Sequence, residues 1–462
     1  MTLTHHTETR RPLACIILAA GKGTRMKSDL PKVLHKVAGR SMVAHVVAAA
    51  SLLAPEKIIA VIGPGMESVA AEVAPHATVV QENQRGTGDA VMAARALLDG
   101  FDGDVLVAYG DTPLVTARTL GAMVQARREA SDPAVVVLGM RPAAPGAYGR
   151  LILGAEGGLD AIVEYLDATE EQRAVTLCNA GLMAFDGARL FGLLDSIGSD
   201  NAKGEYYLTD AVAVARAAGY ACRVVEAPAD EVVGVNSRAE LAEVELIMQR
   251  RLRAAAMAAG ASLADPDTVY FSHDTRLGRD VLVGQNVVFG LGVDIADKVE
   301  IKPFCHLEEV IVSPGAIIGP FARLRPGAEI GPDAHIGNFV EIKNARVHEG
   351  AKVNHLTYIG DATVGSKANI GAGTITCNYD GFFKSHTEIG AGAFIGSNSS
   401  LVAPVTIGEG AIIGAGSVVT RDVPAASLAV ARGRQSIYEG WASSFRTRRA
   451  AEKAEKAAKG KK

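Results

Sequence analysis

The C-terminal half of this sequence carries apolar, mostly aliphatic side chains in four runs at six-residue spacing, with one five-residue step inside a run. The spacing recurs in Leu277, Val283, Phe289, Ile295, Ile301 and Leu307; Ile318, Leu324, Ile330, Ile336 and Ile342; Val353, Ile359, Val364 and Ile370; and Ile389, Ile395, Leu401, Ile407, Ile413 and Val419. A period of six suits neither an α-helix nor a simple alternating strand. It is typical of a parallel β-helix, in which each hexad forms one short face and one tight corner.

The phase of this repeat breaks near residues 342–353 and 376–389. We expect loops to leave the β-helix at both places, and loops on a rigid scaffold often carry function.

The N-terminal half has a different pattern, in which short apolar runs alternate with helical segments. Strand-like runs at 13–18, 57–62, 105–108 and 134–138 flank helical patterns at 41–53 and 87–98. This alternation predicts a Rossmann-like α/β domain, with a parallel sheet covered by helices on both faces. Residues 237–260 lack internal Gly and Pro and predict one long helix. We therefore expect domains at 1–238 and 260–462, joined by a linker helix at 239–259.

Composition excludes several classes of protein. The net charge of −4 and the pI near 6.3 give no reason to expect a nucleic-acid or membrane partner. Five scattered cysteines suit a reduced, cytoplasmic protein. Arg10-Arg11 and the apolar run after it resemble an export signal only superficially, because the run is short and ends in Gly-Lys-Gly-Thr-Arg. The role of the extension at 1–11 stays open, and the basic tail at 446–462 is expected to be frayed or disordered.

A glycine-rich segment, Leu18-Ala-Ala-Gly-Lys-Gly-Thr-Arg-Met26, follows the first predicted strand. It is not a dinucleotide fingerprint, because Met26 replaces the third glycine, and it is not a P-loop. Gly21 and Gly23 would let the backbone approach phosphates, and Lys22 and Arg25 would supply charge. Asp111 ends another predicted strand and is the candidate ligand for Mg²⁺, which prefers oxygen donors.

The segment Leu-Ala-Ala-Gly-x-Gly-Thr-Arg-Met, followed by Leu-Pro-Lys32, resembles the sugar-phosphate nucleotidyltransferase family. Further motifs follow in that family's order: Gln81-Glu-Asn-Gln-Arg-Gly86-Thr87-Gly88, Tyr109-Gly110-Asp111, Tyr148-Gly149-Arg150, Glu164, Asn179-Ala-Gly181, Gly204-Glu-Tyr-Tyr-Leu-Thr-Asp210 and Gly234-Val-Asn236. With the hexads, residues 13–441 resemble the bacterial bifunctional N-acetylglucosamine-1-phosphate uridylyltransferase / glucosamine-1-phosphate N-acetyltransferase family. The resemblance implies a left-handed β-helix, and UTP and acetyl-CoA as co-substrates in making UDP-N-acetylglucosamine for peptidoglycan and lipopolysaccharide precursors.

The same resemblance implies roles in nucleotidyl transfer. Asn236 would join Asp111 at Mg²⁺, and Lys32 and Arg25 would contact the phosphates. Uracil and ribose would be held by Leu18, Ala19, Ala20, Gly21, Gln81, Gly86 and Thr87, beside Tyr109 and Gly110. The acetylated sugar would be held by Gly149, Glu164 and Asn179.

In the β-helix, acyl transfer to an amine needs a base, and His355 is the candidate because histidine titrates near neutral pH. Glu341 could orient its ring. Arg325 and Lys343 would bind the phosphate of glucosamine-1-phosphate, and Tyr358 and Asn369 would hold the sugar. The family's acetyl-CoA positions match Ala372, Asn378, Tyr379, Ser397, Ala415 and Arg432. The resemblance also implies a homotrimer with active sites between neighbouring β-helices.

Two alternatives share this architecture. One is a monofunctional nucleotidyltransferase whose β-helix serves assembly, which would lack the His355, Arg325 and Lys343 constellation. The other is a non-enzymatic binding module similar to certain translation-initiation exchange-factor subunits, which would not need Lys32, Asp111 and the glycine loop.

Overall fold

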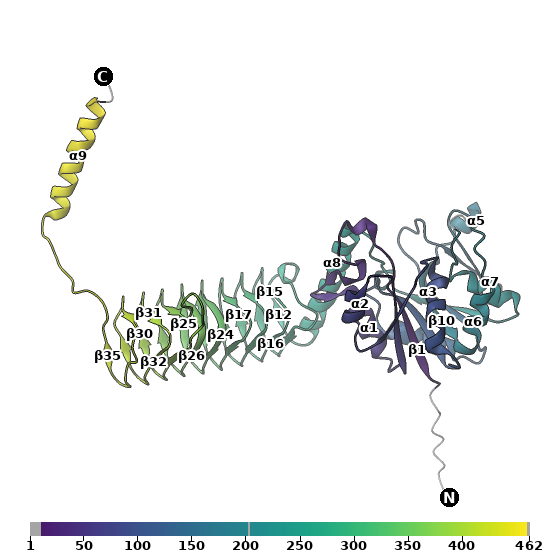
Figure 1. Ribbon diagram of the computed structural model, residues 1–462, viewed down its shortest axis with the longest axis horizontal. Helices are drawn as coiled ribbons and strands as arrows, with labels where there is room; N and C mark the ends of the chain where they lie inside the picture. The colour runs from purple at the N-terminus through teal and green to yellow at the C-terminus, as the bar shows by residue number, and fades with distance from the viewer. Residues whose placement is uncertain (1–10, 202–203, 460–462) are drawn as a thin grey trace, which may run out of the picture. The chain divides into compact units, whose positions relative to one another are not determined.

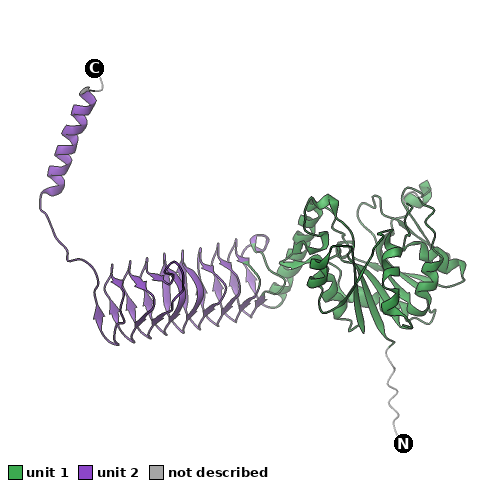
Figure 2. Cartoon of the chain, in the orientation of Figure 1, with its two compact units in different colours: residues 1–259, 269–275, 289–291 green, residues 260–268, 276–288, 292–462 purple. Residues whose placement is uncertain are grey.

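The computed structural model describes residues 11–201 and 204–459, which form two compact units (Figures 1 and 2). The first unit comprises residues 1–259, 269–275 and 289–291, and the second comprises 260–268, 276–288 and 292–462. Each is described below by itself.

The first unit is built on a mainly parallel sheet. Its strands run in the order β11 (Cys222–Ala227), β7 (Val135–Met140), β10 (Cys178–Asp186), β6 (Asp104–Tyr109), β1 (Leu13–Leu18), β4 (Lys57–Ile62) and β5 (Ala77–Val80). The predicted strands are therefore present. However, β10 is antiparallel to both of its neighbours, and the hairpin of β8 (Arg150–Leu153) and β9 (Leu159–Val163) pairs with it. The sheet was expected to be parallel and is instead mixed.

Helices cover both faces of this sheet, as predicted (Figure 1). One face packs against α1 (Met42–Ser51) and α4 (Ala117–Arg127), and the other against α3 (Thr87–Ala93), α6 (Gly187–Asp195) and α7 (Asp210–Ala217). Shorter helices are α2 (Glu67–Glu72) and α5 (Glu170–Arg173). Successive residues of β1 alternate between the two hydrophobic cores, with Cys15 in one and Ile16 in the other. A strand buried on both sides explains the unbroken apolar run in the sequence.

The long helix predicted at 237–260 is α8 (Arg238–Ala258). Ser237 caps its first turn by accepting a hydrogen bond from the Glu240 amide at 3.3 Å. The helix belongs to the first unit, where the Gln249 side chain forms two hydrogen bonds with the Phe271 backbone.

The second unit is a left-handed parallel β-helix with three faces. The first face contains β12 (Ser262–Leu263), β14 (Leu282–Val283), β17 (Glu300–Ile301), β20 (Ile317–Ile318), β23 (His335–Asn338), β25 (Lys352–His355), β27 (Asn369–Ile370), β30 (Phe394–Ile395), β33 (Ile412–Ile413) and β35 (Leu428–Ala429). The second contains β15 (Val288–Phe289), β18 (His306–Leu307), β21 (Arg323–Leu324), the first halves of β24 (Glu341–Val347) and β26 (Tyr358–Val364), β28 (Ile375–Cys377), β31 (Ser400–Val402) and β34 (Val418–Val419). The third contains β13 (Arg276–Leu277), β16 (Val293–Ile295), β19 (Val310–Val312), β22 (Ala328–Ile330), the second halves of β24 and β26, β29 (Thr387–Ile389) and β32 (Val405–Ile407).

The hexad positions face the interior, as predicted. Val283, Ile301, Ile336 and Ile413 are among those that are almost fully buried, whereas Leu277 in the first coil is only partly buried. Each strand pairs with one a full turn of the β-helix away, as Leu282 pairs with Glu300. The repeat therefore sets which side chains are neighbours on the outer surface.

The two breaks in phase have different structures. Residues between Asn378 and His386 do leave the β-helix, which stretches the register so that Asn369 pairs with Phe394. The predicted loop at 342–353 is wrong. Here β24 turns the corner without interruption, pairing first with β21 and then with β22. Ile342 and Val353 are 11 residues apart, one fewer than two full hexads. Asn344 adopts a left-handed φ of 44° at the corner, and this tight turn accommodates the shorter spacing.

The C-terminal tail differs from the expected disorder. Residues Trp441–Lys459 form helix α9, in which Trp441 stacks on Phe445 at 5.0 Å. Ala, Lys, Glu and Arg are all good helix formers, which explains the helix. Residues 1–10 of the predicted extension and 460–462 of the tail lie outside the described residues. Within the described ranges, no helix is long and apolar enough to cross a membrane.

A charge network lies at the amino end of β6. Asp104 and Asp186 are directly paired across β6 and β10, and Arg127, which is fully buried, lies between them. Its Nη2 donates to Asp186 at 2.6 Å and to Asp132 at 2.9 Å, and its Nε lies 3.6 Å from Asp104. Arg128 also donates to Asp104 at 2.6 Å and Arg11 to Asp186 at 2.8 Å, so Arg127 is the fully buried member of a set of arginines that neutralises the two carboxylates.

We expect Arg127→Ala to destabilise the first unit by about 3 kcal/mol, because Asp104 and Asp186 lose the buried cation between them and keep only the partly exposed Arg128 and Arg11. Urea unfolding of the full chain, followed by helical circular dichroism, measures the change. Arg141→Ala is the control, since the exposed Arg141–Glu226 pair contributes little. A loss as small as the control's would contradict the assigned role.

The same network predicts that the free energy of unfolding of the first unit depends on pH. Burial alone would raise the pKa of Asp132 and Asp186, but hydrogen bonds and charges from Arg127, Arg189 and Arg11 outweigh burial and lower both pKa values. Because the folded values lie below the unfolded one, near 3.9, the stabilisation is present above about pH 4 and is lost as the pH falls below it.

Candidate active sites

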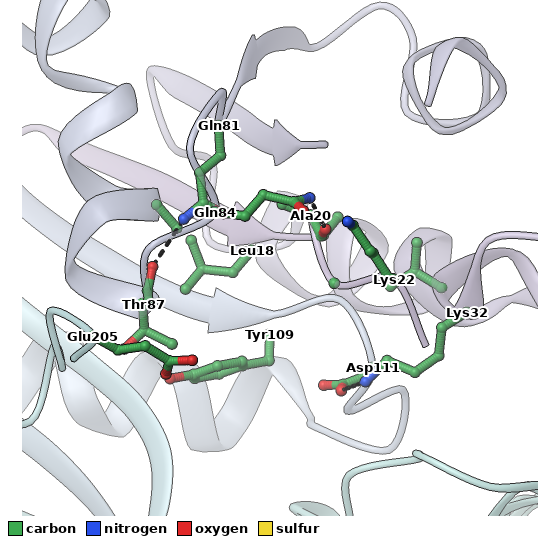
Figure 3. Close-up of a pocket in the computed structure, with 15 residues that line it drawn as sticks. Leu18, Ala20, Lys22, Lys32, Gln81, Gln84, Thr87, Tyr109, Asp111 and Glu205 are labelled. Atoms are coloured by element: carbon green, nitrogen blue, oxygen red, sulfur yellow. Dashed lines mark hydrogen bonds and ion pairs between the residues drawn. The ribbon is translucent and has the colours of Figure 1, made fainter. Parts of the chain in front are cut away.

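A pocket of about 390 Å³ opens at the carboxyl ends of β5, β4, β1 and β6 (Figure 3). In open parallel sheets ligands bind at this edge. Most of the residues predicted for the nucleotide line it, namely Leu18, Ala19, Ala20, Gly21, Lys32, Gln81, Gly86, Thr87, Tyr109 and Asp111. Sequence reasoning did not assign Val33, Gln84, Ala90 or Glu205, which also line it.

The charged end of the pocket is organised by Lys32. Its ammonium contacts Asp111 Oδ2 directly and lies 3.1 Å from Asn236 Oδ1. Gly23 permits this arrangement, because a Cβ there would lie 2.5 Å from the Lys32 Cβ. The structure thus brings together three predicted residues from distant segments, although Asn236 is not in the pocket lining. Burial would raise the pKa of Glu240, but hydrogen bonds from the Asn236 backbone N–H, at 2.7 Å, and from Ser237 lower it, and the exposed Arg25 adds a smaller lowering.

Tyr109 connects the two ends of the pocket. Burial raises the pKa of its phenol to about 12, and Asp111 and Glu164 contribute, while a hydrogen bond with the Thr87 side chain opposes the rise. The phenol therefore stays neutral. Gly110 follows it and donates its N–H to the Leu18 carbonyl at 2.9 Å, which joins β1 to β6 just below the pocket.

The residues predicted for the acetylated sugar form a cluster next to Tyr109. The Asn179 backbone N–H donates to the Gly149 carbonyl at 2.8 Å, and the Asn179 side-chain oxygen accepts from the Gly181 N–H at 2.9 Å. A Cβ on Gly149 would lie 3.4 Å from a Glu164 carboxylate oxygen. Asn179 and Gly149 are therefore held in fixed positions, and glycine leaves room over the carboxylate.

In the second unit, His355 lies at a corner of the β-helix. Its Nδ1 is 2.8 Å from Oδ1 of Asn338, its neighbour one coil earlier. A carbonyl oxygen can only accept, so Nδ1 carries the proton and Nε2 is left with a lone pair. The expectation that Glu341 orients this ring was wrong, because Asn338 holds it and Glu341 instead pairs with Arg325 at 2.7 Å.

The predicted acetyl-CoA positions continue from His355 along the same corner. Asn338, His355, Ala372 and Ser397 each accept a backbone hydrogen bond from the next coil, and Arg432 donates to the Ala415 carbonyl at 2.9 Å. We call Asn338, His355, Ala372, Ser397 and Ala415 the corner column. Its side chains change from polar to small just past His355.

Cations gather on the second face beside this column. Lys384, on the loop that leaves the β-helix, lowers the pKa of Lys343 through direct contact and like charge, and Arg325 adds to the effect. The loop is held by Asp380, whose carboxylate accepts from the Phe382 and Phe383 amides at 2.8 and 2.7 Å. Lys384 was missed from sequence, because the position of a loop residue depends on how the loop folds back.

The remaining predicted residues surround this region. Glu341 and Tyr358 are paired neighbours on the second face, and Asn369 lies on the first face next to Lys352. The Asn378 amide contacts Asp361, and Tyr379 donates to the Gly381 carbonyl at 2.6 Å. These side chains begin the loop that carries Lys384.

Comparison with known proteins agrees with both halves of this description. Residues 15–177 match the MobA-like NTP transferase domain, and residues 309–344 and 386–421 match the bacterial transferase hexapeptide repeats. The chain is 60% identical to the bifunctional protein GlmU of Paramagnetospirillum magneticum, over 96% of this chain and 99% of that protein. It is 64% identical to GlmU of Rhodospirillum rubrum, over 94% and 97%. For GlmU of Xanthobacter autotrophicus the identity is 56%, over 95% and 98%. Identity of 56–64% over nearly the full length favours the bifunctional family over both alternatives, and the chain belongs to the family of bifunctional GlmU transferases.

Proposed function

We propose that this bifunctional enzyme makes UDP-N-acetylglucosamine in two consecutive steps, each in one unit. The second unit acetylates glucosamine-1-phosphate with acetyl-CoA, and the first transfers UMP from UTP to the product, releasing pyrophosphate. The observation that carries the proposal is that each unit holds its own set of reactive and charge-binding groups: Lys32, Asp111 and Asn236 in one, and His355, Lys343 and Arg325 in the other.

In the acetylation step, His355 Nε2 accepts a proton from the sugar ammonium, since only the free amine is a nucleophile. The hydrogen bond from Nδ1–H to Asn338 fixes the ring in the required tautomer. The amine then forms a bond to the thioester carbon, the carbon–sulfur bond breaks, and the departing thiolate takes up the second proton that the nitrogen loses as it becomes an amide. Ala372, Ser397 and Ala415 give the pantetheine a flat surface beside the base, and Asn378, Tyr379 and Arg432 border it.

The sugar phosphate binds where Lys343, Lys384 and Arg325 converge. Like charges held this close repel one another, which is why the pKa of Lys343 is lowered, and a phosphate dianion relieves the repulsion. Glu341 keeps Arg325 in place. Tyr358 and Asn369 contact the sugar ring from the two faces that meet at His355.

In the uridylylation step, a phosphate oxygen of N-acetylglucosamine-1-phosphate bonds to the α-phosphorus of UTP as the bond to pyrophosphate breaks. The protein needs no nucleophile, since positioning and neutralising charge are the main requirements. Lys32, Lys22 and Arg25 supply positive charge near the triphosphate. Gly149, Glu164 and Asn179 hold the acetylated sugar beside Tyr109.

The charged end of the pocket fits Mg²⁺. Asp111 Oδ2 and Asn236 Oδ1 converge on the Lys32 ammonium, and such a pair of oxygens suits a small hard cation that takes one or two protein ligands. These two residues would hold the ion, which would neutralise charge on the phosphates and so favour displacement of pyrophosphate. Lys32 would then be released to the phosphates.

An apolar stack beside the corner column supports assembly as a homotrimer through the β-helix. Phe304, Phe321 and Phe339 stack at 4.9 and 5.1 Å, and Leu356 continues the stack next to His355. All four are about half exposed or more, with left-handed φ values of 50–63°. That conformation is costly for bulky residues. The third face instead presents Asp294, Glu329, Arg346 and Glu388. An apolar corner next to the base suits packing against neighbouring copies.

Location and domain division complete the proposal. The described cysteines are free thiols, and all but Cys377 are buried, as suits a reducing cytoplasm. The functional division is 1–238 for uridylyl transfer, 239–259 for the linker helix and 260–462 for acetyl transfer.

An assay with glucosamine-1-phosphate, acetyl-CoA, UTP and Mg²⁺ tests the function by following CoA thiol and pyrophosphate separately. We expect both products from the wild-type chain. Lys32→Ala and Asp111→Asn should each reduce pyrophosphate release by orders of magnitude while thiol release continues. His355→Ala should lose thiol release, and with it pyrophosphate release, until N-acetylglucosamine-1-phosphate is supplied directly. Normal pyrophosphate release by Lys32→Ala, or full acetylation by His355→Ala at neutral pH, would refute the role assigned to that residue.

Lys384→Ala should raise the KM for glucosamine-1-phosphate by about tenfold or more, with a smaller change in kcat, because one of three cations around the phosphate is removed. Steady-state thiol release at varied sugar phosphate measures both constants. Arg346→Ala, on the third face, is the matched control and should leave both unchanged. An unchanged KM in Lys384→Ala would contradict the phosphate site.

Phe321→Asp should dissociate the trimer, because it places a charge in the apolar corner, and sedimentation velocity reports the change in mass. Ile311→Asp adds the same charge at an exposed aliphatic residue of the third face and should leave the trimer intact. Acetyl transfer should fall with dissociation while uridylyl transfer persists. A trimeric Phe321→Asp would place the interface elsewhere.

A further inference from the structure

The nucleotide pocket contains a buried amide whose orientation is fixed by its neighbours. Gln81 follows β5 and is 6% exposed. Its Nε2 donates to the Gly86 carbonyl at 2.9 Å and to Asp89 Oδ2 at 2.8 Å. Both partners are acceptors only, and together they use both hydrogens of the amide nitrogen. The group that Gln81 offers to the pocket is therefore its oxygen, Oε1.

The carboxylate that holds this amide is itself held. Asp89 lies in the first turn of α3, and the Oδ2 atom that binds Gln81 also accepts from the Arg85 backbone N–H at 3.0 Å. The loop before α3 is joined to Tyr206, whose N–H donates to Arg85 and whose carbonyl accepts from Gly88, both at 2.8 Å. A Cβ on Gly86 would lie 2.6 Å from that carbonyl. Neither partner of Gln81 can easily move away.

Gln81 lies at the end of the pocket where a nucleobase fits. Lys22, Lys32 and Asp111 gather at one end, whereas Gln81 and Thr87 lie away from Lys32 and Asp111 (Figure 3). Leu18 and Ala90, both nearly buried, line the pocket together with Gln81. A triphosphate bound at the charged end leaves its base against this apolar wall, with the amide at its edge.

We propose that Asp89 is a positioning residue that makes the pocket select uracil over cytosine. The inference rests on the proposed uridylyl transfer. Uracil carries an N–H at N3, which can donate to Gln81 Oε1, whereas cytosine carries a lone pair there and an amino group beside it. The pocket thus distinguishes two bases of nearly equal size by one hydrogen bond. With uracil the bond forms, and with cytosine two lone pairs repel each other. Without Asp89, only the Gly86 carbonyl holds the amide nitrogen, and a flipped amide could present its NH₂ group to the lone pair of cytosine.

The test compares kcat/KM for UTP and CTP in pyrophosphate release by the full-length protein. Asp89→Ala should lower the UTP-to-CTP ratio by about tenfold or more, since an unmade or mismatched buried hydrogen bond costs about that much in rate. Asp89→Asn should restore most of the ratio, because its Oδ1 can still accept from Gln81. Glu82→Gln removes an exposed carboxylate from the same loop and should leave the ratio unchanged.

The ratio separates positioning from a general structural role. If Asp89 only stabilised the start of α3, Asp89→Ala would lower both rates equally and leave the ratio unchanged, which would overturn the inference. Turnover of UTP by the same variant verifies that its first unit is folded. If the wild-type chain turns over UTP and Asp89→Ala leaves the UTP-to-CTP ratio unchanged, only this inference is refuted. If the wild-type chain does not turn over UTP, the uridylyltransferase assignment is refuted as well.

Discussion

Parallel pairing between successive coils of the β-helix determines where the side chains of the second unit lie. The inward aliphatic residue of each hexad is buried, so each coil must stack on the last in one register. Outward residues then acquire neighbours about three hexads away along the chain. His355 meets Asn338 and not Glu341 for this reason. The small residues assigned to the thioester follow His355 along the same corner because of the same pairing.

Much of the fold follows from sequence patterns that reflect burial. The hexads predict the β-helix, the apolar runs predict the strands of the sheet, and the Gly- and Pro-free stretch predicts α8. The antiparallel direction of β10 and the tight corner at Asn344 were not predicted. Both depend on which strand lies beside which, and neither leaves a local signal in composition. The helix α9 was missed because a charged, apolar-poor tail was read as disordered, although its residues are good helix formers.

The candidate sites show the same division. Asp111 and the glycine loop are recognisable because a strand end and a glycine pair have local signatures. Lys384 and Asn338 do not, since the first depends on how a loop folds back and the second on a register of one coil. Asp89 is hidden in another way, because an acidic residue in the first turn of a helix is common for stability alone. Its functional role becomes visible only in the structure, where one carboxylate oxygen accepts hydrogen bonds from both the Gln81 side chain and the Arg85 backbone.

The corner column also makes the β-helix a molecular ruler. Along it, the order of residues in space repeats their order in sequence, one position per coil, from Asn338 through His355 to Ala415. A whole coil added before Phe304 would lengthen the unit yet keep the proposed base and the proposed thioester surface adjacent. The same coil added between His355 and Ala372 would separate them by the height of one strand spacing, about 4.8 Å. Length can therefore vary at one end of this unit, whereas between those two residues it is set by the size of the substrates.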